Sequence, residues 1–159
     1  MGLFYEDLEV GHASTSPGRT ITEADIVIFA GLTGDLVELH TNEEAARRSR
    51  FGRRIAHGAL VFSMSVGLAT RMHLLDDCLL AFAGVDHLRF VEPVGIGDTI
   101  HITKRVVERR EVGADSGVVT FETRVLNQHD TLVVIYHDKL LMKRRPLAAS
   151  GGEEGRVEE

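Results

Sequence analysis

The sequence predicts an α+β fold in which an antiparallel β-sheet wraps around one long central helix. The stretch from Gly58 to Met72 is apolar on almost every helical face, which is typical of a helix buried on all sides. After Asp77 the pattern changes to short alternating or apolar runs separated by turn residues, which is typical of strands joined by hairpins. A sheet packed around the helix is the simplest arrangement that buries both elements.

Length predicts a single domain, and net charge bears on its partners. The chain has 159 residues, and no linker or internal repeat divides it. We expect one domain over residues 1–145 and a disordered acidic tail over residues 146–159, which ends in GGEEGRVEE. The formal net charge of -6 argues against nucleic acid as a partner.

Three features bear on the location of the protein. No apolar run is long enough to span a bilayer. The start, MGLFYEDLEV, lacks the basic segment and apolar run of a signal peptide. Cys78 is the only cysteine, which excludes an internal disulfide. We therefore expect a cytoplasmic protein without membrane association.

Local signals mark the first helix at both ends. Thr22-Glu23-Ala24-Asp25 is a capping box, and apolar residues at helical spacing follow it. Gly34 is a natural C-terminal stop. We expect a helix over residues 23–33, with a short strand before it near Ser14 or Arg19.

The next segment predicts a loop between two helices. A second capping box, Thr41-Asn42-Glu43-Glu44, indicates another short helix and places His40 just before its N-terminus. Asp35 directly follows the stop of the first helix. On one continuous helix Asp35 and His40 would be turned roughly 140° from each other, whereas a loop allows their side chains to converge.

The second half of the chain predicts four or five antiparallel strands. Their apolar or alternating patterns fall within residues 79–83, 87–91, 99–107, 119–125 and 131–142. Turn residues at 113–117 and 127–130 indicate two hairpin connections.

Asp35 and His40 are the first candidates for chemistry. A carboxylate and an imidazole within reach of one water molecule can activate it as a general base and acid. The alternative is that the two residues only cap neighbouring helices. Spacing alone favours this alternative, because Asp after a helix and His before one are common.

Gly58 and His57 are the next candidates. The first N–H groups of the helix that begins at Gly58 have no intrahelical acceptor and lie at the positive end of its dipole. They can stabilise a carbonyl oxygen that gains negative charge, although Gly58 can also be a simple N-cap. We interpret His57 as structural, turned inward to bond the backbone. No tight ligand spacing supports a metal site from Asp35, His40 and His57, so we expect no metal.

Five arginines form a basic cluster in this acidic protein, at positions 47, 48, 50, 53 and 54. Arginine pairs well with phosphate oxygens, so the cluster is suited to phosphate binding. A solvated face paired with Glu43 and Glu44 explains it at least as well.

The segments GDLVELH (34–40) and FGRRIAHG (51–58) resemble the MaoC-like dehydratases, which include the (R)-specific enoyl-CoA hydratases. FVEPV (90–94), with GDT (97–99) after it, resembles the strand and turn that follow the helix in that family. The resemblance extends from about Phe4 to Arg145. It implies the hot dog fold, an antiparallel sheet around one long helix, and a homodimer that can assemble into larger oligomers.

The resemblance also implies an activity. Asp35 and His40 would hold the catalytic water, and the Gly58 N–H would bind the thioester oxygen. The enzyme would interconvert a 2-enoyl-CoA and a 3-hydroxyacyl-CoA, with no cofactor beyond the coenzyme A of its substrate. The residues expected to contact the substrate are His57, Ala59, Phe62, Val66, Arg53 and Arg54.

The sequence departs from the family at one point. The hydratase pattern usually reads Asp-x-Asn-Pro-x-His, and here Val37 and Glu38 replace the Asn-Pro pair. A Glu38 carboxylate turned inward would favour a protonated His40 and raise the pKa of Asp35. Two alternatives stand beside the hydratase. One is a hot-dog acyl-CoA thioesterase, in which Gly58 would serve equally well. The other is a non-catalytic acyl-CoA-binding subunit, whose activity was lost with the Asn-Pro pair.

Overall fold

The computed structural model describes residues 2–146. The predicted acidic tail therefore lies outside the described residues, apart from Pro146. In the described part of the chain, no helix combines the length and apolar character needed to cross a membrane.

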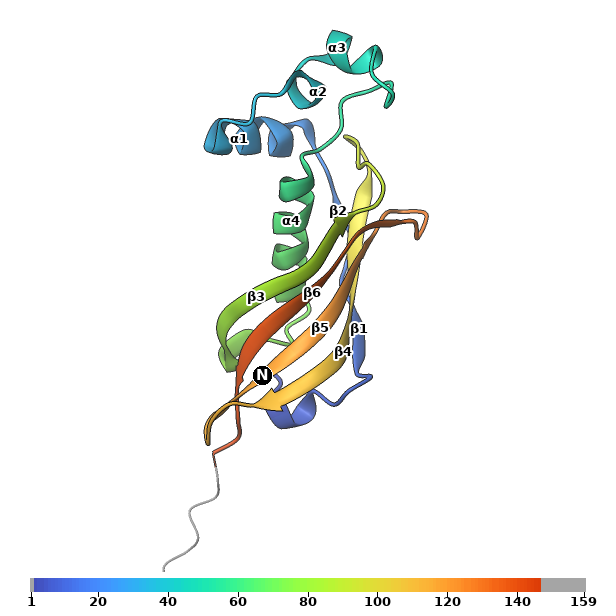
Figure 1. Ribbon diagram of the computed structural model, residues 1–159. Helices are drawn as coiled ribbons and strands as arrows, with labels where there is room; N and C mark the ends of the chain where they lie inside the picture. The colour runs from blue at the N-terminus through green and yellow to red at the C-terminus, as the bar shows by residue number, and fades with distance from the viewer. Residues whose placement is uncertain (1, 147–159) are drawn as a thin grey trace, which may run out of the picture.

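Six antiparallel strands form a sheet, which confirms the predicted α+β class (Figure 1). Five of them follow the order β1-β4-β5-β6-β3, and β2 pairs with β4. The strands are β1 Ala13–Thr15, β2 Arg19–Thr20, β3 Leu79–Phe90, β4 Thr99–Glu111, β5 Ser116–Leu126 and β6 Leu132–Lys143. Figure 1 shows the sheet curving along helix α4, with α1, α2 and α3 gathered beyond the N-terminal end of that helix.

Strand β3 is longer than the sequence predicts. The two expected strands at 79–83 and 87–91 are one strand, whose pairing with β6 shifts register at three places. One shift lies between Asp86 and Arg89, where His87 has a φ of 55°. Bulges of this kind interrupt the alternation of side chains, which explains why the pattern looks like two separate runs.

Helix α1, Glu23–Thr33, has the predicted ends. The Thr22 hydroxyl accepts a hydrogen bond from the Asp25 N–H, and the Asp25 carboxylate accepts one from the Thr22 N–H at 2.8 Å. Gly34 ends the helix with a φ of 75°, a left-handed conformation that glycine adopts without strain. The chain then turns directly into Asp35.

The second helical signal lies one residue later than predicted. Helix α3, Glu43–Arg47, is capped by Asn42, whose side chain accepts from the Ala45 N–H at 3.2 Å. A separate turn of helix, α2 Glu38–Thr41, precedes it. The expectation that His40 lies outside a helix is therefore wrong, because His40 is part of α2.

Helix α4, Gly58–Thr70, packs one face against the concave side of the sheet. Its buried residues are Leu60, Val61, Ser65, Leu68 and Ala69. The prediction that it is buried all round is wrong for the single chain, because a stripe of small residues is exposed at positions 59, 63, 67 and 70. Small residues such as these occur in both buried and exposed positions, so composition alone could not distinguish the two environments.

Candidate active site

Three polar side chains meet where α1, α2 and α4 come together. Asp35 follows α1, His40 lies on α2, and His57 immediately precedes α4. One ligating atom from each side chain lies within 4.8 Å of the others. The structure thus brings Asp35 and His40 together as the sequence predicts, and it adds His57 to the pair.

Backbone carbonyl groups orient both imidazole rings. The Nδ1 of His40 donates to the Ile55 carbonyl oxygen at 2.7 Å, and the Nε2 of His57 donates to the Asp35 carbonyl oxygen at 3.0 Å. A carbonyl oxygen only accepts, so each neutral ring keeps one nitrogen lone pair. In His40 this lone pair is on Nε2, which makes that atom available as a base.

His57 supports His40 from within the core. The two rings stack with their centroids 3.9 Å apart and their planes inclined by 31°, and Phe29 packs on His57 at 5.1 Å. His57 is 2% exposed, and its Nδ1 is buried without a hydrogen-bond partner among residues 2–146. These contacts agree with the interpretation of His57 as a structural residue bonded to the backbone.

The three side chains are close enough together for one metal ion or one water molecule to lie between them. The expectation that no metal binds therefore stays a prediction.

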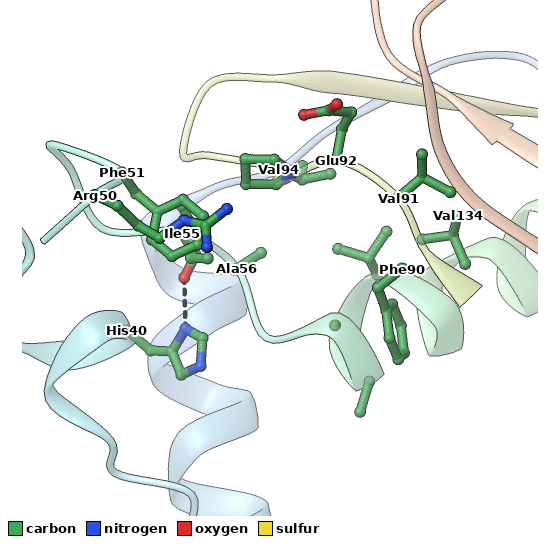
Figure 2. Close-up of a pocket in the computed structure, with 14 residues that line it drawn as sticks. His40, Arg50, Phe51, Ile55, Ala56, Phe90, Val91, Glu92, Val94 and Val134 are labelled. Carbon is green, nitrogen blue, oxygen red and sulfur yellow. Dashed lines mark hydrogen bonds between the residues drawn. The ribbon is translucent and has the colours of Figure 1, made fainter. Parts of the chain in front are cut away.

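A cavity of about 600 Å³ opens beside His40 (Figure 2). One wall is the loop at residues 50–56, another is the N-terminus of α4, and the third is the segment at residues 90–94. Apolar side chains, including Val61, Phe90 and Val134, line most of it. A mainly apolar cavity with few polar groups is typical of a small-molecule site.

Gly58 lies where this cavity meets the N-terminus of α4. The N–H groups of the first turn have no acceptor within the helix, so they can donate to a ligand oxygen. A Cβ atom at Gly58 would lie 2.9 Å from the ring of Phe90, which is closer than a real contact permits. Glycine therefore allows Phe90 to lie over the start of the helix.

The other predicted contact residues are distributed unevenly. Ala59 lines the cavity, whereas Phe62 and Val66 do not. Phe62 instead packs edge to face on Tyr136, with 5.0 Å between ring centroids. Val66 is half-buried further along α4.

Two arginines that were predicted to contact the substrate, Arg53 and Arg54, also do not line the cavity. Arg53 forms an ion pair with Asp98 at 3.2 Å. Arg54 lies between Glu23 and Glu43, each at 2.9 Å, and these carboxylates raise its pKa. Both guanidinium groups therefore join elements of the fold.

Glu38 does not turn inward toward Asp35 and His40. Its carboxylate accepts a hydrogen bond from the Asn42 side chain at 3.1 Å, on the exposed side of α2. Val37 is the N-cap of α2, and its carbonyl oxygen accepts from the His40 N–H at 2.9 Å. The altered positions therefore form the turn that carries His40.

Sequence reasoning missed several residues of the cavity, among them Arg50, Phe51 and Glu92. Arg50 was part of a cluster whose members have no distinguishing local pattern. Phe90 to Val94 carried the family resemblance, but no local signal placed this segment against Gly58.

The chain belongs to the MaoC-like dehydratase family, because the sequence model of the MaoC like domain matches residues 9–128. It is 39% identical over 104 residues to the (R)-specific enoyl-CoA hydratase of Rhodospirillum rubrum, which covers 65% of this chain and 69% of that protein. It is 38% identical over 115 residues to Protein MaoC of Klebsiella aerogenes. That match covers 70% of this chain and spans only 34% of the relative's length.

Solved structures agree with this assignment. The MaoC-like dehydratase of Rhodospirillum rubrum superimposes with a TM-score of 0.82 at 32% identity, covering 92% of this chain and 100% of that one. A Mycobacterium tuberculosis protein described as a double hotdog fold gives a TM-score of 0.82 at 20% identity, over 94% of this chain and 47% of that one. The fold of this chain is therefore the predicted hot dog fold.

Proposed function

We propose that the protein is a hydratase/dehydratase that interconverts a 2-enoyl-CoA and a 3-hydroxyacyl-CoA. The observation that carries the proposal is the Asp35–His40 pair, because His40 lines a cavity that the N-terminus of α4 also lines. The relatives support it, since one is named an (R)-specific enoyl-CoA hydratase and another, at 36% identity, a 3-hydroxybutyryl-CoA dehydratase from Methylorubrum extorquens.

In hydration, Asp35 and the Nε2 of His40 hold a water molecule against C3 of the enoyl group. Water loses a proton to this pair as its oxygen bonds to C3. Negative charge moves onto the thioester oxygen, where N–H groups at Gly58 stabilise it. The pair returns a proton to C2, so one water molecule is added and no other reactant or cofactor is consumed.

We also propose a homodimer in the cytoplasm. Strand β3 is at the edge of the sheet and exposes Leu80 and Phe82. Helix α1 exposes Ile28 and Leu32, the latter to 80%. An unpaired sheet edge and exposed apolar side chains are features that a subunit interface can cover. Light scattering should give twice the mass of the chain, and a monomer at assay concentration would contradict the proposal.

The activity test is the ultraviolet absorbance of crotonyl-CoA and of a branched enoyl-CoA, with a thiol-trapping reagent in parallel. A hydratase removes the enoyl absorbance without releasing thiol. Thiol release would instead indicate the thioesterase, for which Gly58 could serve equally well. Binding of both compounds without either signal would indicate a non-catalytic subunit.

Replacing Gly58 by Ala should lower kcat/KM for crotonyl-CoA by roughly 5- to 150-fold, which corresponds to the roughly 1–3 kcal/mol that overpacking of this size costs. The new methyl group displaces Phe90, which lines the cavity. The double variant Gly58→Ala/Phe90→Leu should recover part of the loss. If steady-state kinetics show no recovery, the steric explanation is wrong.

A further inference from the structure

We propose that Arg50 binds a phosphate of the coenzyme A moiety and so favours phosphate-bearing thioesters over otherwise identical ones. The inference rests on the proposed function, because it assumes that the cavity accepts a thioester. It assigns a binding role to Arg50, whereas the sequence analysis expected Arg53 and Arg54 to contact the substrate.

Most of the basic cluster is already neutralised by carboxylates. Arg47 contacts Glu43 and Glu44, at 3.5 and 2.8 Å. As described above, Arg53 and Arg54 also hold ion pairs within the fold. A guanidinium group that already binds a carboxylate has fewer N–H donors and less net charge to offer a phosphate.

Arg48 and Arg50 differ from these three, since neither forms an ion pair with a carboxylate in the described part of the chain. Only Arg50 lines the cavity. Its guanidinium carbon lies 5.3 Å from the centroid of the Phe51 ring, and Phe51 lines the same wall. The ring restrains the guanidinium group without occupying its N–H donors.

The cavity is divided in a way that orients a thioester. Figure 2 shows Arg50 on the loop wall above His40 and away from Phe90 and Val134. Apolar side chains near Gly58 suit the acyl chain, whereas the loop wall carries the charged Arg50 beside its apolar residues. With the thioester oxygen at Gly58, the arm then leads past His40 toward Arg50.

Few charged side chains line the cavity, so Arg50 has a large effect on whether a phosphate binds there. Among residues 2–146, Glu92 is the only other fully charged side chain that lines the cavity, and its carboxylate repels a phosphate. Arginine donates two parallel N–H groups to phosphate oxygens, which is the strong geometry for this pair. Arg50 is therefore the cationic side chain of this cavity that can bind a phosphate, away from the N-terminus of α4.

The test uses three thioesters with the same acyl group, namely crotonyl-CoA, crotonyl-phosphopantetheine and crotonyl-pantetheine. Arg50→Gln should raise KM for crotonyl-CoA about tenfold with little change in kcat, since a charge-assisted hydrogen bond is worth roughly that factor. KM for crotonyl-pantetheine, which has no phosphate, should not change. Arg48→Gln is the matched control and should leave all three values as in the wild type.

The phosphopantetheine compound identifies which phosphate is bound. If Arg50→Gln raises KM for both crotonyl-CoA and crotonyl-phosphopantetheine, Arg50 binds the phosphate next to the pantetheine arm. If KM rises only for crotonyl-CoA, Arg50 binds a phosphate of the nucleotide part. An unchanged KM for crotonyl-CoA, or an equal rise in KM for crotonyl-pantetheine, would overturn the proposal.

Calorimetric titration with free coenzyme A keeps this test separate from the proposed activity. Arg50→Gln should weaken binding of coenzyme A about tenfold relative to the wild type and to Arg48→Gln. If the wild type binds coenzyme A but hydrates neither enoyl-CoA, the hydratase assignment fails while the role of Arg50 stands. Equal affinities in the three proteins would refute the role of Arg50.

Discussion

Asp35→Asn and His40→Ala should each lower kcat for crotonyl-CoA by at least about a hundredfold, the lower end of what a general acid or base contributes. Asp35→Asn keeps the size of an exposed side chain and removes its charge. His40→Ala removes the Nε2 base together with the Nδ1 hydrogen bond to Ile55. Steady-state kinetics on the purified variants measure both effects, and near-normal turnover in either would contradict the assignment.

Glu38→Gln is the matched control for these variants. Glu38 is in the same segment, but its carboxylate bonds Asn42 and does not face Asp35 or His40. Its kcat should remain within about threefold of the wild type, because a surface substitution away from the site has a small effect. Thermal melting of all three variants separates loss of chemistry from loss of fold.

The parts of the fold that were predictable from sequence depend on local chemistry. Thr22 and Gly34 define the ends of α1, because a capping box and a left-handed glycine act within a few residues of the chain. The strand patterns of β4, β5 and β6 follow from the alternation of buried side chains. Bulges in β3 were not predictable, since nothing in the residues around His87 specifies a register shift.

In the site, too, features set by neighbouring residues were predictable, and contacts between distant residues were not. Gly34 and the following helix signal predicted that Asp35 and His40 converge, and the structure brings them together. The stacking of His40 on His57, and the contact of Phe90 with Gly58, join residues that are distant in sequence. The division of the arginines into paired and unpaired members likewise depends on carboxylates from other elements.

The second large effect is expected at a buried ion pair that the sequence did not indicate. Lys104 and Asp138 are 3% and 2% exposed, and Lys104 Nζ lies 2.5 Å from Asp138 Oδ2. Burial lowers the pKa of Lys104, and the adjacent carboxylate of Asp138 opposes that shift. Thr123 donates its hydroxyl to Asp138 at 2.6 Å, which completes a polar cluster between the sheet and α4.

Asp138→Ala should lower the free energy of unfolding by roughly 3–5 kcal/mol, because it leaves the buried Lys104 without a partner. The double variant Lys104→Met/Asp138→Leu should be close to the wild type in stability, since it removes both charges and keeps apolar volume. Urea unfolding followed by circular dichroism measures the two values. Equal losses in the single and double variants would show that packing, and not the unpaired charge, sets the cost.

The double variant also tests whether this cluster positions the active site. Tyr136 is adjacent to the cluster on β6, and its hydroxyl bonds Ser65 of α4 at 2.9 Å. Helix α4 carries Gly58 at its N-terminus, so a shift of the helix would move the N–H groups proposed to bind the thioester oxygen. If the double variant is stable and retains kcat, the ion pair serves only the fold. A stable double variant with a lowered kcat and an unchanged KM would assign the cluster a role in orienting α4.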